Sequence, residues 1–274
     1  MFNTKKMATQ ATPARVYALL RILQNSEDHG MERNILREKM MTDKDSDYSH
    51  AIEETAFELG IFSDDNGYYS LTEDGEKILN IPDYKLFVIS KLPQFRSGIF
   101  YKVTQAILSL NGNYLYSENP ELTTRELMNT IQEKINDDGI PDVSSVRAWR
   151  FWASYIGLGF TFGQQKMIFV PNASNYLEMV IKSKMSDLIG TEMNISTFLD
   201  RLGSEVSLLV TEEDRKNRRL NLAVSSGLSN LHSKRLINIW HELDEKEVWT
   251  GQFSFQPGVS QISRITYLGE NTND

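Results

Sequence analysis

The 274-residue chain contains no cysteine, which excludes disulfide bonds and every zinc or iron–sulfur site that depends on thiolate ligands. It has only four histidines, and their spacing matches no common metal motif. It lacks an apolar run near the roughly 18 residues of a membrane span, and its first residues lack the apolar core of a signal peptide. We therefore expect a cytoplasmic protein with no membrane segment, no metal site and no cofactor.

A surplus of positive charge is also missing, because the formal net charge is -8. Proteins that bind nucleic acid over a broad surface usually carry a basic domain or a basic stripe. Any contact with nucleic acid must therefore come from local basic patches. Otherwise the exposed surface serves contacts with other proteins.

Catalytic motifs are missing as well. No serine and histidine form a nucleophile-elbow pattern. Gly157-Leu158-Gly159 lacks the later Gly-Lys of a phosphate-binding loop. Acidic runs such as 43–47 and 244–247 fall in expected turns, where solvation explains them better than the metal site of a nuclease. We expect no enzymatic activity and no catalytic residues.

The most informative stretch runs from Asp47 to Leu79. Apolar residues at spacings of three and four predict a helix that ends at Gly60, a residue type suited to the left-handed position after a helix. Two short strands then flank Asn66-Gly67, a strong hairpin-turn signal. A break at 72–75 leads towards another helix. This order is that of the second half of a winged helix.

Two helices are expected before this stretch. Thr12 can cap the first and Pro13 can open it. A second helix is expected over 31–41. The side chains expected to face inwards are Val16, Leu19, Leu20 and Leu23 in the first helix and Ile35, Leu36 and Met40 in the second. Residues 12–80 would then form one complete helix–helix–helix–wing module, preceded by a flexible leader over 1–11.

A connector over 81–97 and a second winged-helix module over 98–182 are expected next, with a third helix over 146–156 and a wing from Phe160 to Val170. A helical segment and a third winged-helix module are expected over 183–270. Its expected elements are a strand over 206–210, a helix over 212–225, a helix over 230–243 with Leu243 facing inwards, and a hairpin of 248–255 with 261–268.

The chain therefore resembles tandem winged-helix proteins, a mainly α fold with small β-wings (α+β). It is similar to the KITE class of accessory subunits of SMC-type ATPase complexes. It also resembles small subunits of bacterial anti-phage and DNA-modification operons, such as Lamassu-like systems and deazaguanine DNA-modification clusters. This resemblance implies a non-enzymatic accessory subunit in antiviral defence that docks partner proteins, an SMC-like ATPase among them, and touches double-stranded DNA. The alternative is a stand-alone DNA-binding transcriptional regulator.

In a DNA-binding winged helix, the third helix enters the major groove, so its charges indicate the ligand. The first module's third helix contains Glu53, Glu54 and Glu58 but no Lys or Arg, so we expect it to avoid DNA. The second module's third helix carries Arg147 and Arg150 on one face. These arginines are candidates for DNA contact, and a solvated surface is the equally good alternative.

The third module contains the densest basic cluster, with Arg215, Arg218 and Arg219. Acidic residues just upstream make a salt-bridged surface helix the competing interpretation. Ser233, Lys234 and Arg235 lie in the helix expected over 230–243 and are the better DNA-binding candidates there, because no acidic residue directly precedes them.

Overall fold

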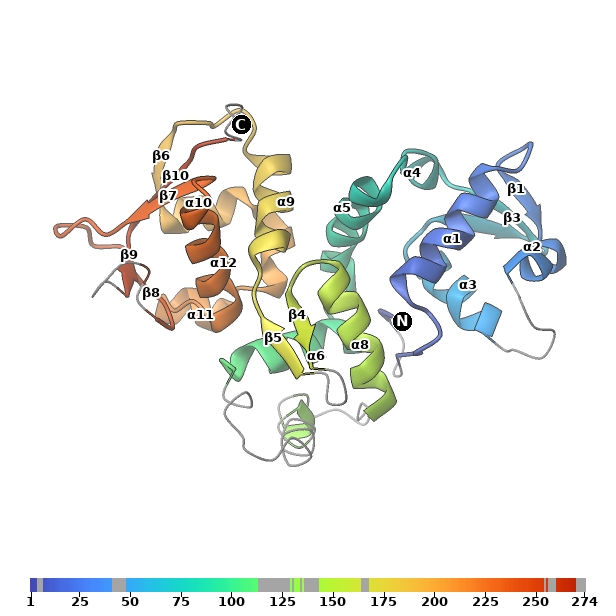
Figure 1. The fold of residues 1–274 in the computed structure, drawn as a ribbon, viewed down its shortest axis with the longest axis horizontal. Coiled ribbons are helices and arrows are strands. Elements are labelled where there is room, and N and C mark those ends of the chain that lie inside the picture. The colour runs from blue at the N-terminus through green and yellow to red at the C-terminus, as the bar shows by residue number, and fades with distance from the viewer. Residues whose placement is uncertain are drawn as a thin grey trace. The chain divides into compact units, whose positions relative to one another are not determined.

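The computed structural model describes residues 1–3, 7–40, 48–112, 129, 131–133, 135, 143–163, 168–253, 255 and 260–269 (Figure 1). The protein is a mixed α+β chain, about 54% helical, with small antiparallel sheets. It divides into two compact units. Unit 1 comprises 1–103 and 135–155, and unit 2 comprises 104–134 and 156–274, so both units contain residues of the predicted module 98–182. Within the described ranges, no helix is long and apolar enough to cross a membrane.

Unit 1 is built from short helices around one three-stranded sheet. Its elements are α1 (Pro13–Gln24), β1 (Gly30–Glu32), α2 (Arg33–Met40), α3 (Tyr48–Glu58), β2 (Phe62–Asp65), β3 (Tyr68–Leu71), α4 (Glu73–Glu76), α5 (Ile81–Lys91), the 3₁₀ helix η1 (Leu92–Phe95) and α8 (Val143–Tyr155). The chain passes from unit 1 to unit 2 within α6 (Ile99–Ser109).

The first helix confirms its prediction. The Thr12 side chain accepts a hydrogen bond from the amide of Arg15, and Pro13 opens α1. The whole predicted stripe of Val16, Leu19, Leu20 and Leu23 is fully buried. The residues predicted as a leader also contribute to the core of unit 1, where the ring of Phe2 stacks on that of Phe95 with 5.3 Å between their centroids.

The predicted helix over 31–41 is wrong at its start. Gly30–Glu32 forms β1, in which Met31 pairs with Tyr69, and α2 begins only at Arg33. The change of element shifts the buried face, so Leu36 is buried but Ile35 is 45% exposed. A three-residue strand is too short to show a period of two in the sequence, which is why it was missed.

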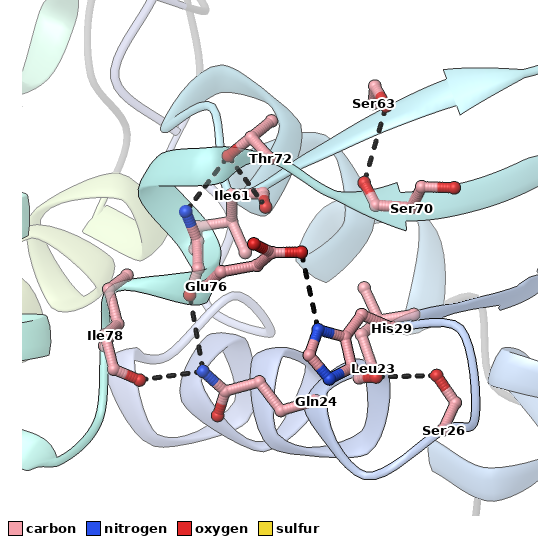
Figure 2. Close-up of polar contacts among 11 residues, drawn as sticks. Leu23, Gln24, Ser26, His29, Ile61, Ser63, Ser70, Thr72, Glu76 and Ile78 are labelled. Atoms are coloured by element: carbon pink, nitrogen blue, oxygen red, sulfur yellow. Dashed lines mark hydrogen bonds and ion pairs between the residues drawn. The ribbon is translucent and has the colours of Figure 1, made fainter.

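The hairpin of β2 and β3 follows its prediction, with Asn66 and Gly67 both at positive φ in the turn. Figure 2 shows how the chain continues from it. The hydroxyl of Thr72 accepts from the amide of Gly75 at 3.0 Å, and the Gln24 amide group at the end of α1 donates to the Ile78 carbonyl at 2.7 Å. A Cβ at Gly75 would overlap the carbonyl oxygen of Ile61, so this position requires glycine.

Unit 2 also contains a three-stranded sheet, together with two smaller hairpins. Its elements are β4 (Gly159–Phe162), β5 (Ile168–Pro171), α9 (Ser174–Lys184), β6 (Glu192–Asn194), α10 (Ile195–Arg201), the 3₁₀ helix η3 (Gly203–Leu208), α11 (Glu212–Asn217), α12 (Leu222–Ser233), β7 (Ile237–Trp240), β8 (Trp249–Thr250), β9 (Gln261–Ile262) and β10 (Arg264–Tyr267).

Several predicted elements of this region are wrong. The helix predicted over 212–225 is divided, because Arg218 adopts a left-handed conformation after α11 and Asn221 caps α12. The helix predicted over 230–243 ends at Ser233 and is followed by β7, which leaves Leu243 90% exposed. The strand predicted over 206–210 overlaps the 3₁₀ helix η3. In the predicted hairpin, only β8 and β9 pair with each other, while β10 pairs with β6 and β7.

The two three-stranded sheets share one topology. The strand order is β1-β3-β2 in unit 1 and β6-β10-β7 in unit 2, so the last strand lies in the middle of each sheet. Met31 of β1 pairs with Tyr69 in the middle strand, and Met193 of β6 pairs with Ile265. Each sheet therefore has the same order of strands, the same directions and a matching register.

Hydrogen bonds extend this equivalence to the second helices. The first amide of α2, on Arg33, donates to the carbonyl of Gly67 just before the middle strand at 2.8 Å. The first amide of α10, on Ile195, donates in the same way to the carbonyl of Ser263 at 3.0 Å. These bonds place α2 and α10 at the same register with respect to their sheets.

The third helices also end in the same way. The residue after each helix end is left-handed, Gly60 with φ 73° after α3 and Arg235 with φ 59° after α12. The next amide donates at 3.0 Å to the carbonyl five residues earlier in both cases. By this register, Glu53 of α3 corresponds to Leu228 of α12. Unit 2 differs by carrying two insertions, η3 with α11 before α12, and β8 with β9 before β10.

Candidate functional site

Glu53 of α3 is a buried carboxylate with three partners. It is 3% exposed and accepts hydrogen bonds from Arg33 Nε at 3.1 Å and from Arg37 Nε at 2.7 Å, both of α2. Tyr69 of β3 donates its hydroxyl to the same carboxylate at 3.1 Å. Burial, followed by the charge of Glu53, raises the pKa of Tyr69 to about 12. This cluster fixes α3 to α2 and to the sheet.

Glu58, at the end of α3, is also used inside the unit. Its carboxylate accepts hydrogen bonds from the Met1 ammonium group at 2.7 Å and from the Phe2 amide at 2.8 Å. Of the three carboxylates that led us to expect no DNA contact by this helix, Glu53 and Glu58 are engaged within unit 1. Only Glu54 is exposed to solvent.

The outer face of α3 consists of His50, Glu54 and Phe57, which we call the α3 stripe. These residues follow one another at spacings of four and three and therefore lie on one side of the helix. All three are exposed, and Phe57 exposes 56% of its surface although its ring lies 6.0 Å from that of Phe62. No Lys or Arg occurs in α3. The stripe therefore offers an aromatic ring, an imidazole and a carboxylate.

The α8 helix presents positive charge instead. Arg147 is exposed and Arg150 is half-buried, one turn apart on the same helix. Burial, and then the positive charge of Arg147, lower the pKa of Arg150. Trp149 and Trp152 are both buried, and the indole N–H of Trp152 donates to the Ala11 carbonyl at 2.7 Å. Two arginines close together on an exposed face form a surface suited to an anion such as phosphate.

The candidates at α11 have partners within unit 2. Arg215 forms an ion pair with Asp200 at 2.7 Å, and Arg218 Nη1 donates to the Lys246 carbonyl at 2.9 Å. Arg219 is exposed and forms a β-bridge with Thr250. The first two side chains tie α11 to neighbouring segments, while their contact with DNA remains a prediction.

Ser233, Lys234 and Arg235 lie at the carboxyl end of α12 and not in the middle of a helix. Lys234 lies 3.5 Å from Glu178, and the Ser233 hydroxyl donates to the Ser229 carbonyl at 3.0 Å. The carboxyl end of a helix carries partial negative charge, so its dipole does not favour phosphate there. Their role as DNA contacts also remains a prediction.

In α12 itself, the positions that correspond to the α3 stripe are less exposed than in α3. Ser225, Ser229 and His232 replace His50, Glu54 and Phe57. Ser225 is fully buried and its hydroxyl accepts from the amide of Gln252 at 3.1 Å, while Ser229 and His232 are half-buried. The insertion that contains β8 therefore covers this face at Ser225, and the amide of Ile239 in β7 donates to His232 Nδ1 at 3.4 Å.

Gly227 brings α12 close to α9. A Cβ there would lie 2.9 Å from Leu177 and 3.0 Å from the backbone of Ala173 and Ser174. The corresponding residue in α3 is Ile52, whose side chain is buried. This close packing and the insertion make α12 an internal helix. Its sequence from Leu222 to Ser233 contains no Lys or Arg.

Sequence reasoning missed the cluster of Arg33, Arg37, Glu53 and Tyr69. A signal was present, because Arg33 and Arg37 are four residues apart and Glu53 falls among apolar residues of the next helix. Over the ranges that the structure describes, no group of three or more His, Asp or Glu residues could hold a metal ion.

Searches of protein-family models, of curated proteins and of solved structures find no match to this chain. The functional conclusion therefore depends on the residues and geometry of the chain itself.

Proposed function

We propose that the chain is a tandem winged-helix protein and acts as a non-enzymatic accessory subunit of a larger bacterial DNA-processing or anti-phage complex in the cytoplasm. The matching topologies and registers of the two three-stranded sheets support the winged-helix assignment. So does the order of three helices followed by a hairpin in unit 1. The partners would be proteins, an SMC-type ATPase among them.

The observation that carries the proposal is the chemistry of the third helices. In DNA-binding winged helices the third helix supplies the basic and polar side chains that meet the duplex. Here α3 has no Lys or Arg, and α12 has none and is covered by the chain itself. Two of the three candidate reading helices are therefore unsuited to DNA, which favours winged helices that serve protein contacts.

The arginines of α8 support a secondary role for DNA. Arg147 and Arg150 lie one turn apart on a helix that shows no acidic residue in its first turn. Such a pair can neutralise phosphates of a duplex without reading its sequence. The same pair is the observation that favours the alternative function, a stand-alone transcriptional regulator.

Titration of the full chain into a labelled duplex at low and moderate salt tests the proposal. We expect weak binding in the micromolar range that falls steeply with salt. Replacing both α8 arginines by Gln should weaken binding and reduce the salt slope by about one per phosphate contact removed. The matched control, Lys39→Gln with Lys77→Gln, removes the same charge at exposed positions of residues 12–80, which are expected to avoid DNA, and should leave binding nearly unchanged.

Footprinting separates the two functions. The accessory subunit should protect no discrete sequence, and it should form a stable complex with purified products of genes adjacent to its own. Nanomolar binding with protection of a short palindrome would contradict the proposal and establish the regulator instead.

A further inference from the structure

We infer that the α3 stripe (His50, Glu54 and Phe57) is a docking face for a basic, apolar segment of a partner protein. This inference deepens the proposed function, because it assigns the partner's chemistry to one helix. It starts from the corresponding helix of unit 2, where a segment of the same chain lies on the equivalent face.

In unit 2 the covering segment contacts α12 at Ser225 and contacts Leu220, which lies just before the cap of α12. The amide of Gln252 donates to the hydroxyl of Ser225, and the Gln252 side chain donates to the Leu220 carbonyl at 3.2 Å. The ring of Phe255, 8% exposed, packs beside Gly251, next to the Ser225 hydroxyl. A peptide backbone therefore lies against this third helix at Ser225, with an aromatic ring beside that backbone.

Among the described residues of unit 1, no segment corresponds to this insertion. Its hairpin turns directly from β2 to β3 at Asn66 and Gly67, whereas unit 2 inserts β8 and β9 at the equivalent point. The α3 stripe therefore keeps Phe57 more than half exposed. Glu54 has no hydrogen-bond or ion-pair partner among the described residues, whereas Glu53 and Glu58 of the same helix are both satisfied. The framework is shared, and the part of unit 1 that the structure describes contains no equivalent of the covering segment.

The charge around the stripe defines the occupant. Residues 12–80 contain 15 Asp and Glu against 7 Lys and Arg, a surplus as large as the net charge of -8 of the entire chain. Asp64 adds to this charge beside α3, because it pairs with Tyr69, whose hydroxyl reaches Glu53 of α3. The net negative charge of this segment disfavours phosphate and favours Lys and Arg.

The expected ligand therefore combines two features. An aromatic or aliphatic side chain would cover Phe57, as Phe255 packs at α12, and flanking Lys or Arg side chains would pair with Glu54 and Asp64. Aromatic side chains are typical of the centre of protein interfaces, and polar or charged side chains are typical of the rim. The positive rim would also accelerate association at low salt.

A synthetic peptide of alternating Lys, Arg, Phe and Leu residues provides the probe, with two matched peptides that carry Glu for the basic residues or Ser for the apolar ones. Isothermal titration with the full chain should give micromolar binding of the first peptide alone. Phe57→Ala and Glu54→Lys should each weaken it tenfold or more. Circular dichroism melting checks that both variants remain folded.

Two control variants separate docking from general attraction. Glu27→Lys changes the charge as much as Glu54→Lys does, at an exposed position after α1. Tyr68→Ala removes a 39% exposed aromatic ring next to Tyr69 in β3, on the opposite face of that strand. Both should change the affinity less than twofold. Equal effects of Glu27→Lys and Glu54→Lys, or no binding by the wild-type chain, would overturn the inference.

Failure of this inference is distinct from failure of the proposed function. Absence of peptide binding removes the α3 assignment only, because the accessory role is tested by footprinting and by complex formation with neighbouring gene products. Duplex binding that weakens with Phe57→Ala would overturn the inference in favour of a nucleic-acid face.

Discussion

Units 1 and 2 fill one framework with opposite chemistry. In unit 1, four corresponding positions hold the charged quartet Arg33, Arg37, Glu53 and Tyr69. In unit 2, the register of strands and helices places Ile195, Leu199, Leu228 and Ile265 there, all fully buried. The same backbone therefore accepts either a satisfied polar cluster or an aliphatic core.

The difference extends to the surface. In unit 1, which contains the quartet, the outer face of α3 is open. In unit 2, α12 is enclosed by α9 and by the insertion that contains β8. A buried ion cluster contributes little net stability but fixes geometry, while aliphatic burial stabilises directly. Unit 1 thus has an oriented, accessible third helix, and unit 2 has a third helix that serves as core.

Removal of the carboxylate from the quartet should have the largest effect. Glu53→Ala leaves two arginines and a tyrosine without their acceptor, which should destabilise unit 1 by about 3 kcal/mol, the lower end for a broken buried pair because both arginines reach solvent. Urea unfolding measures this. Glu54→Ala, on the exposed side of α3, is the control and should stay within about 0.5 kcal/mol of the wild type.

A change in the close packing of α12 against α9 should have the next largest effect on stability. Gly227→Ala brings a methyl group against the backbone of Ala173 and Ser174, which should destabilise unit 2 by about 1–3 kcal/mol through overpacking. Thermal unfolding with Ser226→Ala as control would show it. A stability equal to that of the control would contradict the close packing.

Alkaline pH should lower the stability of unit 1 more than that of unit 2, by a smaller amount than the substitutions above. The pKa of Tyr69 is raised to about 12 from an unfolded value of 10.0, so its contribution to stability is present below pH 10 and is lost as pH rises through about 12. Ile265 cannot titrate. Unit 1 should therefore lose stability before unit 2 in alkaline urea titrations, and Tyr69→Phe should remove this part of the pH dependence.

The smallest change is expected when the whole quartet is exchanged. Arg33→Ile, Arg37→Leu, Glu53→Leu and Tyr69→Ile together install the side chains of unit 2. Replacement of all members of an ion cluster around a buried carboxylate by aliphatic residues is often neutral or stabilising. The quadruple variant should be at least as stable in urea as the wild type, although Glu53→Ala alone is not. A quadruple variant less stable than Glu53→Ala would refute the equivalence of the two units.

Much of unit 1 could be predicted because its signals are local. Thr12 and Pro13 mark the start of α1, and Gly60 and Asn66-Gly67 mark the end of α3 and the hairpin turn. In unit 2 the residue at the position of Gly60 is Arg235, which adopts the same left-handed conformation without a recognisable sequence signal. The helix was therefore extended into β7.

The candidate site could be predicted less well, because burial is set by tertiary contacts. Glu53 is buried among partners from other elements, Arg33 of α2 and Tyr69 of β3, which lie beside it only in the folded unit. Ser225 carries no sequence feature that indicates cover by Gln252. In α8, Trp149 and Trp152 define the buried side of the helix, Arg147 is exposed and Arg150 is half-buried, and contact of these arginines with DNA stays a prediction.

Amide hydrogen exchange of the full chain, alone, with the basic apolar peptide and with duplex DNA, tests the central claim most directly. The account expects the peptide to slow exchange over 48–60, DNA to slow exchange over 143–155, and α12 to exchange slowly in every sample. Protection of 48–60 by DNA, or rapid exchange of α12 in the free chain, would contradict it.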